Sequence, residues 1–221
     1  MSARRLILLR HGRTAWNAQR RFQGHADPPL DEVGRAQAYE VAGIVAALRP
    51  DLLVSSSATR ALQTAEIVAE AVKLDFTVDI RFRERGLGHW EGLTLDEVSA
   101  AYPTEYAEWA AGRDIERPGG ETRDQVAARA LAGLADLPAA VLTVLVTHGA
   151  TAMAVCNALL GLSQRVHPLS ALVNCHWTEM YTEDGRDATW RVRGHNLGAP
   201  GAVVPLPART TESSGPSDAD A

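Results

Sequence analysis

Apolar runs of strand length alternate with stretches of helical periodicity along most of this chain. Four runs predict strands, at 6–9, 52–54, 76–80 and 141–146. Apolar positions three and four residues apart predict the helices between them, at 32–48, 58–72, 95–109, 122–137 and 149–160. Two more β-rich runs, 172–181 and 189–192, flank the turn signal Glu183-Asp184-Gly185 and predict a hairpin. This alternation favours one compact α/β domain.

Two segments interrupt or end this pattern. Glycine and charged residues fill 83–92, which predicts a loop. Beyond Asn196 the sequence consists largely of Pro, Ala, Ser, Thr and Gly, and such a composition buries too little apolar surface to order a chain. We therefore predict a domain over 1–197, with a cap-like helical insertion at about 93–123, and a disordered tail over 198–221.

Composition and charge narrow the classes of function. The 221 residues are 46% hydrophobic, which is enough for one sizeable core. The formal net charge of −5 gives no reason to expect binding to nucleic acid or to an anionic membrane, so a small ligand is the expected partner. Lys73 is the only lysine and no GxxxxGK[ST] motif occurs, which excludes a P-loop nucleotidase. The apolar run at 6–9 is too short for a signal peptide or a membrane span.

The cysteines and five of the histidines show no metal-ligand spacing. Cys156 and Cys175 lack a CxxC arrangement, which argues against a zinc site and against a disulfide framework, and a reducing cytoplasm fits them. We assign no metal to the histidines that lie outside the strand ends, namely His25, His89, His167, His176 and His195. No cofactor is expected.

Polar residues follow three of the predicted strands directly. Arg10-His11-Gly12 ends the first, Ser55-Ser56 with Arg60 just beyond ends the second, and His148-Gly149 ends the most apolar strand. Ligands of open α/β sheets bind outside the carboxyl ends of the strands, so two imidazoles and two guanidiniums should converge there. Guanidinium groups and helix N-termini suit phosphate oxygens, which predicts a pocket for a dianion.

This set of groups can transfer a phosphoryl group. A neutral imidazole in line with a leaving oxygen can attack phosphorus, and His11 is the candidate, with the proton of its other ring nitrogen donated to a backbone carbonyl. Arg10, Arg60 and His148 would stabilise the phosphoryl oxygens. Glu84 is the candidate acid and base, because apolar and glycine neighbours could desolvate it. Glu91 and Asp27 are the rival carboxylates.

Six motifs resemble those of the histidine phosphatase superfamily, which includes the cofactor-dependent phosphoglycerate mutases. They follow in the family's order and cover residue 6 to about 196: LLRHGRTAWN, RFQGHADPPL, SSSATRALQTA, ERGLGHWEG, GGET and VTHG. The resemblance implies a three-layer α/β/α sandwich around a mostly parallel sheet with one antiparallel strand, and a homodimer.

The resemblance also implies roles for individual residues. His11 would be the phosphorylated histidine, Glu84 the acid and base, and the phosphate pocket would consist of Arg10, Arg60 and His148. The substrate side would be formed by Asn17, Gln23 and Gly24, with Thr14 and Gly149 beside them. Arg13 stands where the family usually has Glu or Gln, and selectivity would lie in Arg13, His25 and the 93–123 cap.

The compact GLGHWEG segment is similar to the phosphatase branch rather than to the mutases, which carry a longer insertion after the acid/base loop. The resemblance thus implies a metal-independent phosphatase that forms a phosphohistidine and hydrolyses a small phosphomonoester of sugar-phosphate or phosphoglycerate type. ARRLILLRHG and ALVNCHWTEM also resemble segments of actinobacterial glucosyl-3-phosphoglycerate phosphatases. Two alternatives stay open: a cofactor-dependent phosphoglycerate mutase, and a non-catalytic module that binds phosphorylated ligands.

Overall fold

The central element of the structure, a computed structural model that describes residues 4–166, 168–183 and 189–199, is a mixed sheet. Its strands within those ranges are β1 (Arg4–Arg10), β2 (Leu52–Ser55), β3 (Phe76–Val78), β4 (Leu142–Thr147), β5 (Trp177–Thr182) and β6 (Arg191–Leu197). Their order across the sheet is β3-β2-β4-β1-β5-β6. β3, β2, β4 and β1 are parallel, whereas β5 is antiparallel to both β1 and β6. The predicted sheet with one antiparallel strand is confirmed.

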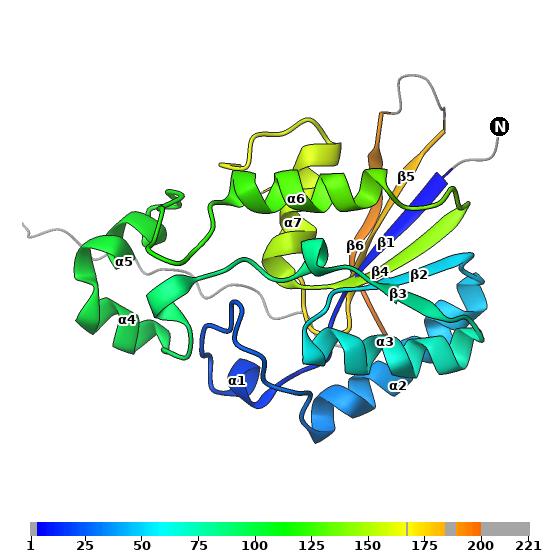
Figure 1. Cartoon of the computed structure of the whole chain (residues 1–221), viewed down its shortest axis with the longest axis horizontal. Coiled ribbons are helices and arrows are strands. Elements are labelled where there is room, and N and C mark those ends of the chain that lie inside the picture. The colour runs from blue at the N-terminus through cyan, green and yellow to red at the C-terminus, as the bar shows by residue number, and fades with distance from the viewer. Residues whose placement is uncertain (1–3, 167, 184–188, 200–221) are drawn as a thin grey trace, which may run out of the picture.

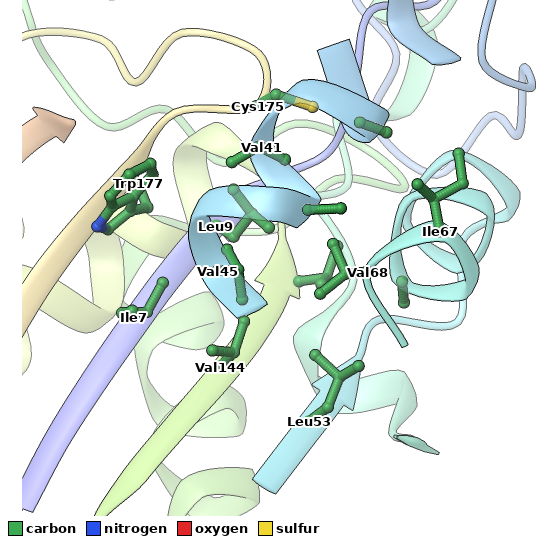
Figure 2. Close-up of a cluster of buried hydrophobic side chains, with 14 of the residues drawn as sticks. Ile7, Leu9, Val41, Val45, Leu53, Ile67, Val68, Val144, Cys175 and Trp177 are labelled. Carbon is green, nitrogen blue, oxygen red and sulfur yellow. The ribbon is translucent and has the colours of Figure 1, made fainter. Parts of the chain in front are cut away.

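Helices cover both faces of the sheet, as Figure 1 shows. One face carries α2 (Glu32–Leu48) and α3 (Thr59–Val72), and the other carries α6 (Arg123–Ala135) and α7 (Gly149–Leu159). Successive side chains of β1 point to opposite faces, so Ile7 and Leu9 pack under α2, in the core drawn in Figure 2, while Leu6 and Leu8 pack on the α7 side. The predicted three-layer sandwich is confirmed.

Helix starts depend on capping groups that the sequence shows only in part. Asp31 caps α2, since its Oδ1 accepts a hydrogen bond from Gly34 N at 2.7 Å. The N-cap residue of α3, Ala58, offers no side-chain acceptor, and Asp27 accepts from Thr59 N at 2.7 Å instead. Ser55 and Ser56 at the end of β2 are buried, and their hydroxyls contact the carbonyl of Ser56 and the ring of His148.

Helices outside the three layers form the cap at one end of the molecule (Figure 1). The predicted helix 95–109 is two helices, α4 (Leu95–Ala101) and α5 (Pro103–Ala110), because a proline at the first position of α5 starts a new helix after Tyr102. Trp90 is fully buried and packs on Phe22 and Trp109, which joins the cap to the rest of the domain.

Short elements modify the predicted loops and strand ends. Within the predicted loops lie α1 (Ala15–Ala18) and the 3₁₀ turn η2 (Gly88–Trp90), and Asp79 ends β3 early by capping the 3₁₀ turn η1 (Ile80–Phe82). The hairpin forms from β5 and β6, but 172–176 is not a strand. Part of its turn and most of the predicted tail lie outside the described residues.

Among the helices that the structure describes, none is both long enough and apolar enough to cross a bilayer.

Candidate active site

Three neighbouring strands, β2, β4 and β1, end around one point. His11 follows β1, His148 follows β4, and Arg60 lies in the first turn of α3 after β2. The ring centroids of His11 and His148 are 5.1 Å apart. All three side chains are at most 2% exposed. The structure therefore brings together the groups that the sequence places at separate strand ends.

The tautomer of His11 follows from its hydrogen bond. Its Nδ1 lies 2.7 Å from the carbonyl oxygen of Gly12, and a carbonyl only accepts, so Nδ1 carries the proton. The lone pair is then on Nε2, and His11 lines the cavity at the strand ends. Burial, followed by the positive charges of Arg60 and Arg10, holds the pKa of His11 well below its ordinary value. The side chain is thus a neutral imidazole at physiological pH, with the lone pair of Nε2 available.

Three buried nitrogens around His11 have no hydrogen-bond partner in the described part of the chain: Arg10 Nε, Arg60 Nε and His148 Nδ1. The rest of each side chain is anchored, since Arg60 donates to the carbonyl of Ala26 at 2.8 Å and that of Gly24 at 3.0 Å, and Arg10 to Leu172 O at 2.5 Å. Buried donors without partners are rare, because each costs about 1–3 kcal/mol. A tetrahedral anion with several acceptor oxygens would satisfy all three.

Ser56 sets the orientation of His148. The hydroxyl of Ser56 accepts from Ala58 N at 3.3 Å and lies 2.8 Å from His148 Nε2. When this hydroxyl donates its proton to Nε2, a neutral His148 carries its own proton on Nδ1. Burial and the charge of Arg60 lower the pKa of His148 well below its ordinary value, which favours the neutral imidazole.

Glu84 lies at the N-terminus of α7. Its Oε2 accepts from Ala150 N at 3.2 Å, and its Oε1 accepts from Thr151 N at 3.1 Å and Arg85 N at 2.9 Å. His148, the N-cap residue of α7, makes no side-chain cap bond, so Glu84 caps this helix from a distant loop. The expected apolar surroundings are wrong, because polar N–H groups surround the carboxylate. The rivals Glu91 and Asp27 do not line the cavity.

The cavity at the strand ends has a volume of about 310 Å³. Its guanidinium groups are those of Arg10, Arg21, Arg60, Arg85 and Arg123, and Glu84 is the only carboxylate among the described residues that line it. Trp109 of the cap closes one side. Arg13 and His25, predicted to set selectivity, do not line it. Arg13 is instead paired with Asp31 at 2.8 Å.

Asn17, Gln23 and Gly24 line this cavity, as expected. Thr14 does not, because it is fully buried and its hydroxyl accepts from Asn17 N at 3.1 Å and donates to Gln23 Oε1 at 3.1 Å. Thr14 therefore orients two of the residues predicted to form the substrate side. Gly149 lines the neighbouring cavity rather than this one.

A positive φ and the nearby carboxylate of Glu91 explain the glycine at position 24. Gly24 has φ +53°, and a Cβ there would lie 2.2 Å from the carboxylate of Glu91. Its carbonyl is also an acceptor for Arg60, so the turn and the phosphate pocket depend on one another.

The sequence did not predict the residues that fix the backbone of the site by hydrogen bonds. Thr64 accepts from Gly12 N at 3.1 Å, and Asn174 donates to the carbonyl of His11 at 3.0 Å. Arg129 donates to the carbonyls of Arg83 and Glu84 at 2.9 and 3.1 Å and fixes the Glu84 loop. Thr64 lies in the SSSATRALQTA motif and Asn174 in the ALVNCHWTEM segment, but neither motif shows which backbone groups these side chains bind. Arg129 lies in none of the six motifs.

Metal-ligating clusters and reactive thiols are both missing from the part of the chain that the structure describes. No three histidine, cysteine or acidic side chains lie close enough together, within the described ranges, to hold a metal ion. Cys156 and Cys175 are buried, and burial raises the pKa of both thiols to about 12. His11 is therefore the candidate nucleophile of the site.

Comparisons with known proteins agree with this geometry. The model of the histidine phosphatase superfamily (branch 1) matches residues 6–197. Glucosyl-3-phosphoglycerate phosphatase of Mycobacterium tuberculosis (strain ATCC 25618 / H37Rv) is 38% identical over 81% of this chain and 86% of that protein. A probable phosphoglycerate mutase of Salmonella paratyphi C (strain RKS4594) is 32% identical over 92% of this chain and 95% of its own length.

Solved structures give the same result. The mycobacterial glucosyl-3-phosphoglycerate phosphatase in complex with inorganic phosphate superposes with a TM-score of 0.79 at 35% identity, covering 89% of this chain and 98% of that one. The chain belongs to branch 1 of the histidine phosphatase superfamily and is a phosphoric monoester hydrolase.

Proposed function

We propose that this phosphatase hydrolyses a small phosphorylated metabolite of sugar-phosphate or phosphoglycerate type through a phosphohistidine on His11. Glucosyl-3-phosphoglycerate is the first candidate substrate, because relatives at 38% identity carry that name. One observation carries the proposal: the unpartnered buried donors of Arg10, Arg60 and His148 surround a neutral imidazole. They offer a phosphoryl group both a binding site and a nucleophile.

The residues divide the reaction into two steps. His11 Nε2 attacks phosphorus, the P–O ester bond breaks, and protonated Glu84 gives its proton to the leaving oxygen. Water then attacks the phosphohistidine, Glu84 takes a proton from that water, and the P–N bond breaks to release inorganic phosphate and neutral His11. Arg10 and Arg60 stabilise the phosphoryl oxygens throughout.

Hydrolysis without a metal is part of the proposal, because the guanidinium groups at the site can supply the positive charge. Purified protein treated with chelator is expected to release phosphate from a panel containing glucosyl-3-phosphoglycerate, phosphoglycerates and sugar phosphates. Rapid quenching should trap an acid-labile, base-stable phosphoryl group on the protein. Absence of phosphate release from every substrate, with or without added metal, would contradict the proposal.

A mutase is the second candidate, because the Salmonella relative is named a probable phosphoglycerate mutase. A mutase returns the phosphoryl group of phosphohistidine to an acceptor hydroxyl instead of to water. Interconversion of phosphoglycerates that depends on catalytic 2,3-bisphosphoglycerate, at a rate above that of phosphate release, would favour it.

The pH dependence of kcat/KM tests the state of His11. Neutral His11 is the active form, and its lowered pKa keeps it neutral as pH falls below its ordinary value of 6.5. The acid limb due to His11 is therefore expected below that value. Replacing Arg60 with glutamine removes a positive charge and should move this limb to higher pH on the same substrate, whose own ionisation cancels in the comparison. A limb that stays in place or moves down would contradict the assignment.

We also propose a cytoplasmic location. Cys156 and Cys175 are both free, which fits a reducing compartment. Recovery of the native activity outside the cytoplasmic fraction of the source cells would contradict this.

A further inference from the structure

Arg123 is a cation at the active site without an acidic partner. It is the first residue of α6, and its side chain lines the catalytic cavity. Its Nη1 donates to the carbonyl of Gly112 at 3.2 Å, and no carboxylate in the described part of the chain lies within ion-pair distance of its guanidinium. Asp114 instead accepts from the backbone N–H of Arg123 at 2.7 Å.

The other four guanidinium groups of the cavity are accounted for. Arg21 pairs with Glu97 at 2.8 Å, and Arg85 pairs with Asp114 at 2.6 Å. Arg10 and Arg60 face the position of the phosphate. Glu84 accepts from three backbone N–H groups, and no ion pair among the described residues joins it to a guanidinium. Within the described part of the chain, Arg123 is therefore the one guanidinium of this cavity that has neither a carboxylate partner nor a place facing the phosphate.

A second cavity, of about 470 Å³, adjoins the first. The two share Arg10, Trp109, Arg123 and Ala150, so Arg123 lies on their common boundary. Beyond that boundary the second cavity is lined mainly by apolar side chains such as Met153, Leu169 and Leu172. A leaving group that passes Arg123 therefore has room to extend into this space.

We infer that Arg123 is a specificity-determining residue that binds a carboxylate on the leaving group, and that the second cavity receives the remainder of that group. This inference rests on the proposed phosphatase function and deepens it by naming the substrate class, phosphate esters of hydroxy acids. Charge-assisted hydrogen bonds to a carboxylate are strong, and planar guanidinium suits both carboxylate oxygens.

A matched pair of substrates tests the inference. 3-Phosphoglycerate carries a carboxylate where glycerol 3-phosphate carries a hydroxymethyl group. For Arg123→Gln we expect a loss in kcat/KM of about 10- to 100-fold on 3-phosphoglycerate, mostly in KM, and less than about threefold on glycerol 3-phosphate. Arg123→Lys should keep part of the preference for the carboxylate. Arg21→Gln is the control, since Arg21 lines the same cavity but is paired, and it should affect both substrates alike.

If Arg123→Gln lowered kcat/KM equally on both substrates, Arg123 would have a structural role and the inference would be overturned. An unchanged kcat/KM on both substrates would overturn it as well. Binding measurements distinguish a failure of this inference from a failure of the proposed function. Calorimetric Kd values of both esters for His11→Ala and for the His11→Ala, Arg123→Gln double variant report on the carboxylate contact without turnover. A wild-type protein that hydrolyses nothing would contradict the phosphatase proposal, whereas an unchanged Kd ratio in the double variant would contradict the role of Arg123.

Discussion

His11→Ala is expected to lower kcat/KM by about 10⁴- to 10⁶-fold, since it removes the group that forms the covalent bond to phosphorus. The pocket around that group does not depend on the imidazole. Arg10 is held by the carbonyl of Leu172, and Arg60 by those of Gly24 and Ala26. We therefore expect the variant to fold and to keep binding inorganic phosphate, measured as a rise in Tm with phosphate concentration.

A histidine outside the site provides the matched control. His195 on β6 bonds to Thr178 and to the carbonyl of Ser170, and it lines neither cavity at the active site. His195→Ala should retain activity within about threefold, because the change leaves the nucleophile and its cations untouched. Substantial phosphohistidine formation in His11→Ala would show that another residue is the nucleophile.

Much of this fold could be predicted from local pattern alone. The apolar run at 141–146 becomes β4 at the centre of the sheet, and Val144, Leu145 and Val146 are fully buried. The break between α4 and α5 and the early end of β3 at Asp79 were missed, because each depends on one capping residue or one proline rather than on periodicity. The type of an element follows from apolar periodicity over many residues, whereas the residue at which it ends depends on a single capping contact or proline.

The candidate site could be predicted where its residues come directly after strands. His11 and His148 directly follow β1 and β4, Arg10 is the last residue of β1, and parallel strand ends meet at one edge of a sheet. The surroundings of Glu84 could not be predicted, because its partners belong to α7, some 66 residues away in sequence. The role of Arg123 could not be predicted for a related reason. It depends on which other arginines of the cavity are paired with acids, and only the structure shows those pairs.

Glu84→Gln is expected to lower kcat/KM for an alkyl phosphate by about 10²- to 10⁴-fold, the usual contribution of general acid catalysis. An alkoxide needs a proton to leave, and Glu84 is the only carboxylate among the described residues that line the cavity. 4-Nitrophenyl phosphate has a leaving group that departs without a proton, so the rate of the first step should fall much less for this ester. The second step still needs a base to activate water. The variant should therefore give a burst of nitrophenolate and accumulate phosphohistidine.

Glu91→Gln separates this catalytic role from a structural one. Glu91 accepts from His25 N at 2.9 Å and from Leu87 N at 3.0 Å, and a glutamine oxygen can accept the same bonds. Glu91 does not line the cavity, so Glu91→Gln should hydrolyse both esters with the kcat/KM of the wild type. In Glu84→Gln the amide oxygen can likewise keep one bond to the N-terminus of α7, which preserves the loop while removing the transferable proton. If both esters lost activity equally in Glu84→Gln and no phosphohistidine accumulated, Glu84 would be a cap of α7 and the acid would have to be another group.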